Sequence, residues 1–193
     1  MKKIPIEISA RHVHLAKEDL EMLFGKDYKL TKKKDLSQPG EFAANETVDI
    51  QKGDKKISQV RIVGPLRGAT QVEMSFTDAF GLGVNVPVRR SGDVKRTPAI
   101  CIIGPKTKIK IGDGAIVSWR HLHTNPEDAK ELKIENRKYV SARVMGKRSL
   151  VFSNVRVRIK NNSITCLHID TDEGNAAGIF GHGSGELILR KFL

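Results

Sequence analysis

Two stretches of similar sequence decide how this chain is organised: residues 11–23 read RHVHLAKEDLEML, and residues 120–132 read RHLHTNPEDAKEL. Six of the thirteen aligned positions are identical: the arginine, both histidines, the Glu-Asp pair and the last leucine. In each copy a strand-like segment runs through His-x-His into an acidic helix start. The repeat predicts two related β-rich halves, each closed by a helix.

A polar stretch separates the two copies. Residues 90–97, RSGDVKRT, contain a glycine and no apolar run. We therefore predict a first half over residues 1–92, which carries RHVH, and a second half over residues 93–193, which carries RHLH. A further similarity, between RIVGP at residues 61–65 and CIIGP at residues 101–105, is interpreted as a second trace of the same duplication.

Most of the chain between these motifs reads as short strands. Apolar or alternating segments recur between turns rich in Gly, Pro and Asn, which is typical of barrels and sandwiches. The expected strands cover residues 4–9, 47–51, 57–63, 70–75, 99–103, 106–111, 114–118, 138–144, 150–158 and 163–169. Short helices are expected at residues 16–24, 126–132 and 172–177. The predicted fold is mainly β with short α: two β-barrel-like halves related by an internal repeat, each capped by short helices.

The chain is long enough for one large domain or two small ones, and it is strongly basic. It has 193 residues, with 34 Lys and Arg against 22 Asp and Glu, a formal charge of +12. This charge makes nucleic acids, acidic membranes and phosphorylated metabolites candidate partners, and a lysine-rich solvated surface is the simpler alternative. Aromatic residues make up only 5% of the chain, which disfavours RNA binding through stacked bases.

Several features bear on the cellular location. The first residues, MKKIPIEIS, are too short and too polar for a signal peptide, and no apolar run approaches the roughly 20 residues of a membrane span. Cys101 and Cys166 lack CxxC spacing, so we expect buried free thiols in a reducing compartment. The predicted protein is cytoplasmic and binds neither membrane nor nucleic acid.

The histidines are the most informative side chains. Four of the six form two His-x-His pairs, His12 with His14 and His121 with His123. Residues i and i+2 of a strand share one face, so each pair can present two imidazoles to one metal ion at about 2.0–2.1 Å. One such pair is weak support for a metal site. Two copies within a repeat favour a metal centre toward which both pairs converge.

The residues alone leave the further ligands open. Glu73 lies in an alternating segment, where it is either a ligand or part of a solvated face. His168 ends an apolar strand and is either a ligand or a histidine bonded locally. His182 lies in a glycine-rich segment near the end of the chain, which we interpret as a flexible tail without a catalytic role.

Two loops carry groups that suit phosphate. Residues 64–68, GPLRG, place Arg67 beside a glycine after a strand, and arginine binds phosphate through two parallel N–H groups. Residues 89–93, RRSGD, add two cations and backbone N–H donors near a turn. Neither loop has the spacing of a P-loop.

Longer runs connect these motifs to a known family. They are SARHVHL at residues 9–15, QPGEFAANE at 38–46, GPLRGATQVEMSFTDA at 64–79, RRSGD at 89–93, WRHLH at 119–123 and HIDTDEGNAAG at 168–178. Together they resemble the PduL-type phosphate acyltransferases, which are the phosphate propanoyltransferases first known from propanediol-using bacterial microcompartments. The resemblance extends from about residue 4 to residue 187.

The resemblance implies roles for individual residues. One zinc ion would be held by His12, His14 and Glu73, and a second by His121, His123 and His168. Arg67 matches the arginine that contacts phosphate and is the expected catalytic residue. Ser91 and Asn175 are expected beside the substrate.

The resemblance also implies the reaction acyl-CoA + phosphate ⇌ acyl phosphate + CoA, with propanoyl or acetyl as the acyl group. We expect direct transfer at a dizinc site, because neither cysteine is placed like a nucleophile. An acetate or propionate kinase is the expected pathway neighbour, and a homo-oligomer is left open. The first strand begins almost at Met1, without the amphipathic helix that directs many members into microcompartments, so the cytoplasm is the expected location and a bacterial microcompartment is the alternative. The alternative function is a dimetal phosphoester hydrolase with the same ligands.

Overall fold

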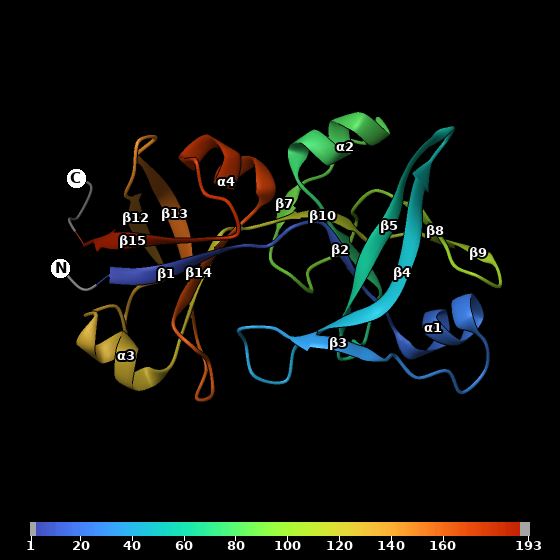
Figure 1. The fold of residues 1–193 in the computed structure, drawn as a ribbon, viewed down its shortest axis with the longest axis horizontal. Coiled ribbons are helices and arrows are strands. Elements are labelled where there is room, and N and C mark those ends of the chain that lie inside the picture. Colours follow the sequence, from blue (N-terminus) through green and yellow to red (C-terminus); the bar gives the residue numbers. More distant parts are fainter. Residues whose placement is uncertain (1–2, 190–193) are drawn as a thin grey trace. The chain divides into compact units, whose positions relative to one another are not determined.

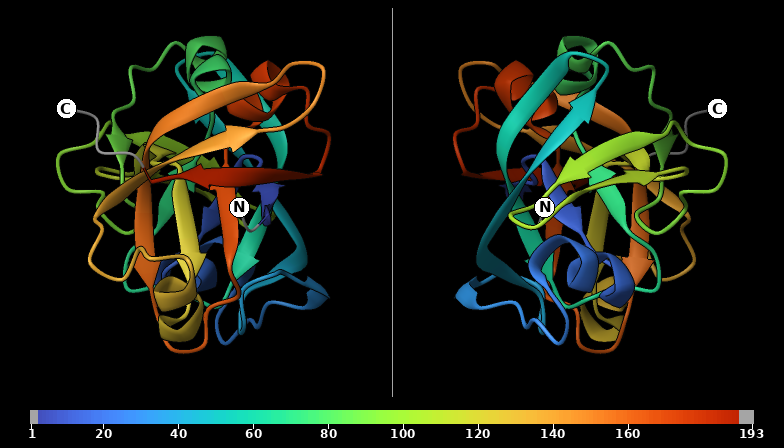
Figure 2. Two further views of the ribbon diagram at one scale, coloured as in Figure 1. Left: turned by 90° about the vertical axis from the view of Figure 1, so that its left-hand side faces the viewer. Right: turned by 90° about the vertical axis from the view of Figure 1, so that its right-hand side faces the viewer.

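A computed structural model describes residues 3–189, and its internal contacts divide the chain into two units (Figures 1 and 2). The first, here called the His12 unit, comprises Ala10–Ser118. The second, the His121 unit, combines the chain before Ala10 with the chain from Trp119 onward. The chain therefore passes from one unit to the other twice, each time shortly before a His-x-His motif.

The His121 unit is a closed barrel of six strands in the order β1-β14-β11-β13-β12-β15. Its strands are β1 (Lys3–Ile8), β11 (His121–Thr124), β12 (Tyr139–Val144), β13 (Leu150–Ile159), β14 (Cys166–Ile169) and β15 (His182–Ile188). Two helices accompany them, α3 (Pro126–Glu131) and α4 (Thr171–Ala177). Alternate residues such as Ile6, Leu122 and Leu167 are fully buried and form the core, as the period of two in a strand requires.

The His12 unit is built on a larger, open sheet in the order β7-β10-β6-β2-β5-β4-β8-β9, with β3 paired to β4. Its strands are β2 (His12–His14), β3 (Lys32–Asp35), β4 (Phe42–Lys52), β5 (Lys55–Gly64), β6 (Gln71–Glu73), β7 (Val88–Arg89), β8 (Ile100–Ile103), β9 (Lys108–Ile111) and β10 (Ala115–Ser118). Its helices are α1 (Lys17–Phe24) and α2 (Phe76–Leu82). A second apolar core, which includes Val13, Ile62 and Val72, lies within this unit.

The two units repeat the same strand pairings around their His-x-His strands. In the His12 unit, β2 runs antiparallel to β6 and parallel to β5. In the His121 unit, β11 runs antiparallel to β14 and parallel to β13. The outer neighbours also correspond, because β10 is parallel to β6 and β1 is parallel to β14. The predicted fold class, mainly β with two repeated barrel-like halves, is confirmed.

The division of the chain differs from the boundary predicted between residues 92 and 93. Strands β8, β9 and β10 belong to the His12 unit, where β8 pairs with β4 and β10 pairs with β6. Strand β1 belongs to the His121 unit, where it pairs with β14 and β15. Backbone hydrogen bonds between distant segments decide these memberships, and the polar composition of residues 90–97 does not reveal them.

The second predicted trace of duplication was wrong. The RIVGP run ends β5 and the CIIGP run covers β8, so both lie in the His12 unit. Both strands pair with β4, one on each side. Their similarity reflects two strands that flank one neighbour rather than a relation between the units.

Most predicted elements are present, and the differences have local causes. The sequence did not predict α2, whose exposed Phe76 and Phe80 give it no clear apolar face. The helix is instead fixed at its start by a capping box between Ser75 and Asp78. His182 begins strand β15 and does not lie in a flexible tail, because its segment pairs with β1.

Candidate metal centres

In the His12 unit, strand β2 presents both histidines of its motif on one face, and β6 adds a carboxylate. The Nε2 atoms of His12 and His14 lie 3.1 Å apart. Oxygen atoms of Glu73 lie 3.8 Å from Nε2 of His12 and 3.7 Å from Nε2 of His14. Ligand atoms about 2.0–2.1 Å from a tetrahedral zinc are separated by roughly 3.3 Å, so these spacings are close to those of a zinc site.

The His121 unit contains the corresponding cluster of three histidines. The Nε2 atoms of His121 and His123 lie 3.0 Å apart. The ring of His168 lies 5.3 Å from that of His121 and 4.9 Å from that of His123, measured between centroids. The side chains of this cluster, like those of His12, His14 and Glu73, offer ligand atoms that all lie within 4.8 Å of one another.

The hydrogen bonds of the rings show why a cation fits. Nδ1 of His12 donates to the carbonyl of Ala10 at 2.8 Å, and Nδ1 of His14 donates to that of Val63 at 3.0 Å. A neutral imidazole that donates from Nδ1 has a lone pair on Nε2. Two lone pairs facing each other at 3.1 Å repel unless a cation or a proton lies between them. The geometry of the pair therefore suits a shared proton or a metal ion.

The same bonding holds for His121, whose Nδ1 donates to the carbonyl of Trp119 at 2.8 Å. Nδ1 of His123 is buried and has no hydrogen-bond partner among the described residues. Carbonyl groups that orient a ring from its far side are a usual feature of histidine metal ligands.

Strand register explains how each pair acquires its third ligand. Glu73 lies opposite His12 across the β2–β6 pair, and His168 lies opposite His121 across the β11–β14 pair. Glu73 is only 6% exposed, so the alternative that it belongs to a solvated face was wrong. Residues directly opposite each other in an antiparallel pair point to the same side of the sheet, which brings each third ligand to its His-x-His motif.

Burial keeps the central histidines in the form that binds metal. Burial first, and then the charges of His12 and Arg67, lower the pKa of His14 to about 3. Burial and the neighbouring His121 and His168 lower the pKa of His123 to about 2. Both rings are therefore neutral near pH 7, and a neutral ring has a nitrogen free for a cation.

The carboxylate of Glu73 is ionised despite its burial. Burial acts to raise its pKa, but interaction with the nearby His12 and His14 rings and the hydrogen bond from Ser91 together lower it to about 2. A buried negative charge is costly unless a positive group compensates it. A cation between Glu73 and the two histidines would supply that compensation.

Arg67 and Ser91, both predicted from the resemblance, lie beside Glu73. The guanidinium of Arg67 donates to Oγ of Ser91 at 2.6 Å, and that hydroxyl donates to Glu73 at 2.6 Å. Arg67 also lies 3.5 Å from Glu41, and its side chain is 28% exposed. One cationic group thus reaches from the solvent-accessible edge toward the carboxylate of the metal cluster.

Gln71 is a member of this network that the sequence did not single out. Its amide nitrogen donates to Glu73 at 2.5 Å and to Ser91 at 2.9 Å. Its amide oxygen accepts the backbone N–H of Gly92 at 2.7 Å. The backbone N–H groups of the RRSGD loop, including this one, had been assigned to phosphate binding from the sequence. The structure instead uses it to fix the loop.

The arginine that opens each R-H-x-H motif forms an ion pair with an acidic residue at an equivalent position in its own unit. Arg11 bonds Asp78 at 2.7 Å, and Arg120 bonds Glu173 at 2.6 Å. Each acidic residue is the third residue of the helix that follows the third ligand, and each belongs to a capping box, with Ser75 in one unit and Asp170 in the other. The repeat in the sequence contained these arginines, but their partners are visible only in the structure.

Three further residues were considered in the sequence: Asn175, Cys101 and Cys166. Asn175 is exposed on α4, where its carbonyl accepts the N–H of Gly178 at the end of the helix. Cys101 and Cys166 are free, but only Cys166 is buried. Burial raises the pKa of Cys166 to about 12, so its thiol is protonated near pH 7.

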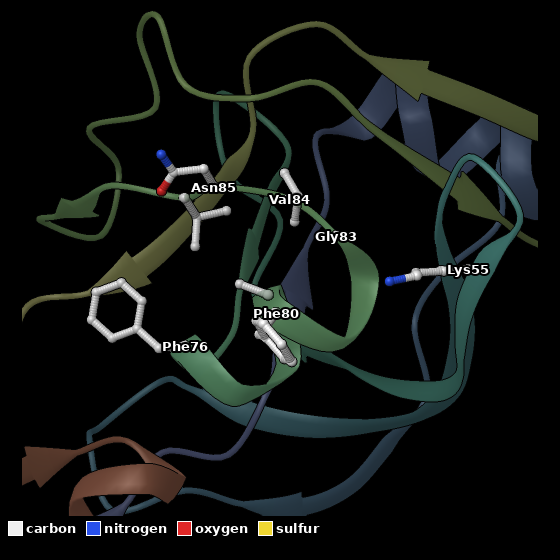
Figure 3. Close-up of a pocket in the computed structure, with 8 residues that line it drawn as sticks. Lys55, Phe76, Phe80, Gly83, Val84 and Asn85 are labelled. Carbon is white, nitrogen blue, oxygen red and sulfur yellow. The ribbon is translucent and has the colours of Figure 1, made fainter.

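A pocket of about 570 Å³ in the His12 unit lies beside α2 (Figure 3). It is lined by Lys55, Phe76, Ala79, Phe80, Gly83, Val84, Asn85 and Val86. None of these is a predicted metal or phosphate residue. The walls are mainly apolar, with one lysine at the edge.

Comparison with known proteins identifies the family. The family model of the phosphate propanoyltransferases matches residues 5–180. The phosphate propanoyltransferase of Lachnoclostridium phytofermentans is 48% identical over 91% of this chain and 83% of its own length. That of Thermotoga maritima is 46% identical over 96% of this chain and 87% of its own length. That of Clostridioides difficile is 42% identical over 97% of this chain and 90% of its own length.

These matches define an acyltransferase enzyme, built here as two repeated β units that each carry a cluster of possible metal ligands. The chain belongs to the phosphate propanoyltransferase family. The resemblance stated from the sequence motifs is thereby confirmed, as is the class of phosphate acyltransferase. No helix within residues 3–189 has the length and apolar character needed to cross a bilayer.

Proposed function

We infer that this protein interconverts acyl-CoA and phosphate with acyl phosphate and CoA, with propanoyl or acetyl as the acyl group. The observation that carries this inference is the pair of metal-binding clusters on equivalent strands, one of them joined to Arg67 through Ser91. Family membership supports the reaction. The clusters and the arginine supply groups that suit a thioester and a phosphate.

Zinc is the ion that the side chains fit best, because imidazole and carboxylate ligands at these spacings suit it. We propose one ion at His12, His14 and Glu73 and one at His121, His123 and His168. Bound zinc would supply Lewis acidity toward the thioester carbonyl and affinity for the sulfur of CoA.

Arg67 is proposed to bind and aim the phosphate. Its partners Ser91 and Glu41 hold the guanidinium from one side, and Ser91 couples it to Glu73. Arginine matches two phosphate oxygens with two parallel N–H groups, so it fixes orientation as well as position. Ser91 lies within hydrogen-bond distance of both Arg67 and Glu73, and it is proposed to line the phosphate position. Asn175 is proposed as a more distant substrate contact.

Direct transfer is proposed, without an acyl-enzyme. Phosphate oxygen would form the new bond to the carbonyl carbon, and the bond to the CoA sulfur would break. The buried thiol of Cys166 is protonated near pH 7 and is a poor nucleophile. We further propose a cytoplasmic location and an acetate or propionate kinase as the consumer of the acyl phosphate.

The test is steady-state turnover of propanoyl-CoA and acetyl-CoA with phosphate, measured as CoA release on protein of known zinc content. We expect phosphate-dependent CoA release with both thioesters, and loss of turnover when zinc is removed. A nitrophenyl phosphate ester and a nucleic acid serve as controls for the hydrolase and nucleic-acid alternatives. Ester hydrolysis without any CoA release would overturn the proposal.

A further inference from the structure

In the His121 unit, a thiol and a carboxylate lie beside the three-histidine cluster and share one of its imidazoles. Glu7 on β1 lies opposite His168 on β14, because the two strands pair in parallel. Cys166 is two residues before His168 on β14 and therefore shares its face. The ligand atoms of Glu7, Cys166 and His168 all lie within 4.8 Å of one another.

The three side chains of this triad differ in exposure. The carboxylate of Glu7 lies 3.5 Å from Nε2 of His168, and its side chain is 26% exposed. Cys166 is only 1% exposed. A cation could therefore approach past Glu7 and reach the buried sulfur last. Ligand atoms of a tetrahedral zinc lie roughly 3.3 Å apart, so small side-chain rotations suffice to bring atoms that are within 4.8 Å of one another to that spacing.

The charges of the triad favour a divalent cation. Once a bound ion has displaced the thiol proton, the thiolate of Cys166 and the carboxylate of Glu7 together carry two negative charges, which balance a dication. The three-histidine cluster has no negative ligand of its own, so an ion there keeps its full charge. Because uncompensated charge is costly where water is excluded, the triad offers a buried dication a better balance.

We propose that Glu7, Cys166 and His168 form a further metal site, selective for thiophilic divalent cations such as Zn²⁺, Cd²⁺ or Co²⁺. The preference for these ions follows from the sulfur ligand, which Mg²⁺ and Ca²⁺ do not favour. Binding displaces the thiol proton, as it does at other cysteine ligands. The site shares His168 with the three-histidine cluster, so its occupancy changes the ligands available there.

Cobalt titration of the reduced, metal-free full-length protein tests this site independently of catalysis. Cobalt bound to a thiolate gives a charge-transfer band in the near ultraviolet, whereas cobalt bound only to nitrogen and oxygen ligands does not. We expect this band in the wild-type protein, its loss in Cys166→Ser, and at least a tenfold weaker apparent affinity in Glu7→Gln. Cys101→Ser is the matched control and should keep the band.

Two results would overturn the proposal. One is a wild-type protein that saturates with cobalt and shows only the visible bands of nitrogen and oxygen ligands. The other is a thiolate band that survives Cys166→Ser and disappears in Cys101→Ser. The wild-type spectrum is decisive even if Cys166→Ser fails to fold. Failure of the acyl-transfer proposal would appear differently, as cobalt or zinc binding without phosphate-dependent CoA release.

Discussion

The His12 unit and the His121 unit use the same strand framework but differ in the third ligand of the metal cluster. At the position opposite the first histidine of each motif, one unit has Glu73 and the other has His168. The first cluster therefore brings one negative charge to an ion and the second brings none. The difference shows that a duplicated scaffold can preserve ligand geometry while changing the charge of the site.

The surroundings of the third ligand differ as well. Gln71, which lies opposite His14, bonds Glu73 and Ser91 and links the cluster to Arg67. The equivalent position in the His121 unit, opposite His123, is occupied by Cys166. One unit thus has a polar network that connects its candidate metal cluster to Arg67, the arginine proposed to bind phosphate. The other has a sulfur and the carboxylate of Glu7.

The largest effect on turnover is expected from substitution of a metal ligand. Substituting one ligand in each unit in turn tests whether both clusters are needed. His121→Ala should remove the ion held by His121, His123 and His168, and His12→Ala the ion held by His12, His14 and Glu73, each lowering turnover more than about 100-fold. Zinc content per chain and CoA release are measured together. His182→Ala, at an exposed histidine outside both clusters, is the control. Full activity with one zinc missing would contradict a dizinc reaction.

The next largest effect concerns Arg67, which Ser91 joins to the cluster of the His12 unit. Arg67→Lys keeps the charge but removes the paired N–H groups, so kcat/KM for phosphate should fall about 100-fold with zinc content unchanged. Steady-state kinetics with varied phosphate give this value. Arg96→Lys changes an exposed arginine of the same unit and should have little effect. An Arg67→Lys enzyme with unchanged kinetics would remove Arg67 from the phosphate site.

A smaller effect is expected from the arginines that both units share. Arg11→Met and Arg120→Met should each weaken zinc binding about tenfold in their own unit, because each arginine holds the helix that follows the third ligand. Competition with a zinc chelator measures the affinity. Performing it in His121→Ala and His12→Ala backgrounds isolates the site of each unit.

Two further variants test whether each arginine acts through its ion pair with the acidic residue. Asp78→Asn should reproduce the effect of Arg11→Met, and Glu173→Gln that of Arg120→Met, without adding to it in the double variants. Additive effects, or an equal effect of Arg11→Met on both sites, would show that these arginines do not position the ligands of their own units.

The smallest effect is a pH dependence of stability in the metal-free protein. The pKa values of His14 and His123 are about 3 and 2 in the folded chain, against 6.5 for an ordinary histidine. Below pH 6.5 the unfolded chain binds protons that the folded chain does not, so stability is complete above this pH and falls as pH decreases. At pH 5.5 the expected loss is about 1 kcal/mol for each histidine.

Urea unfolding of chelator-treated protein at pH 7.5 and 5.5 measures this loss. Glu73 stays ionised in both folded and unfolded chains over this range, since its pKa is about 2 when folded and 4.5 otherwise, so it does not contribute. His123→Gln should remove about half of the pH dependence. Equal stability of the wild-type protein at both pH values would show that these rings are not held neutral.

Local features of the chain were predictable because their causes are local. The short helix α3 begins where Asn125, Pro126 and two acidic residues favour a helix start, and the structure confirms it. Helix α2 was not predicted, because exposed phenylalanines obscured its pattern and its capping box had not been recognised. Strand β15 was missed because its glycine-rich sequence resembles a loop, and only pairing with β1 and β12 makes it a strand.

The sequence by itself determined that the chain is a duplicated β protein with two His-x-His pairs, since a period of two and a repeated motif are properties of the residues alone. Motif resemblance also singled out Glu73, His168, Arg67 and Ser91. Only the tertiary structure decided which strands belong to each unit, that Glu73 and His168 occupy equivalent positions, and that Gln71 and Cys166 lie beside them. The reason is physical: strand register and backbone pairing join residues far apart in sequence, and no local pattern encodes which partner a strand will choose.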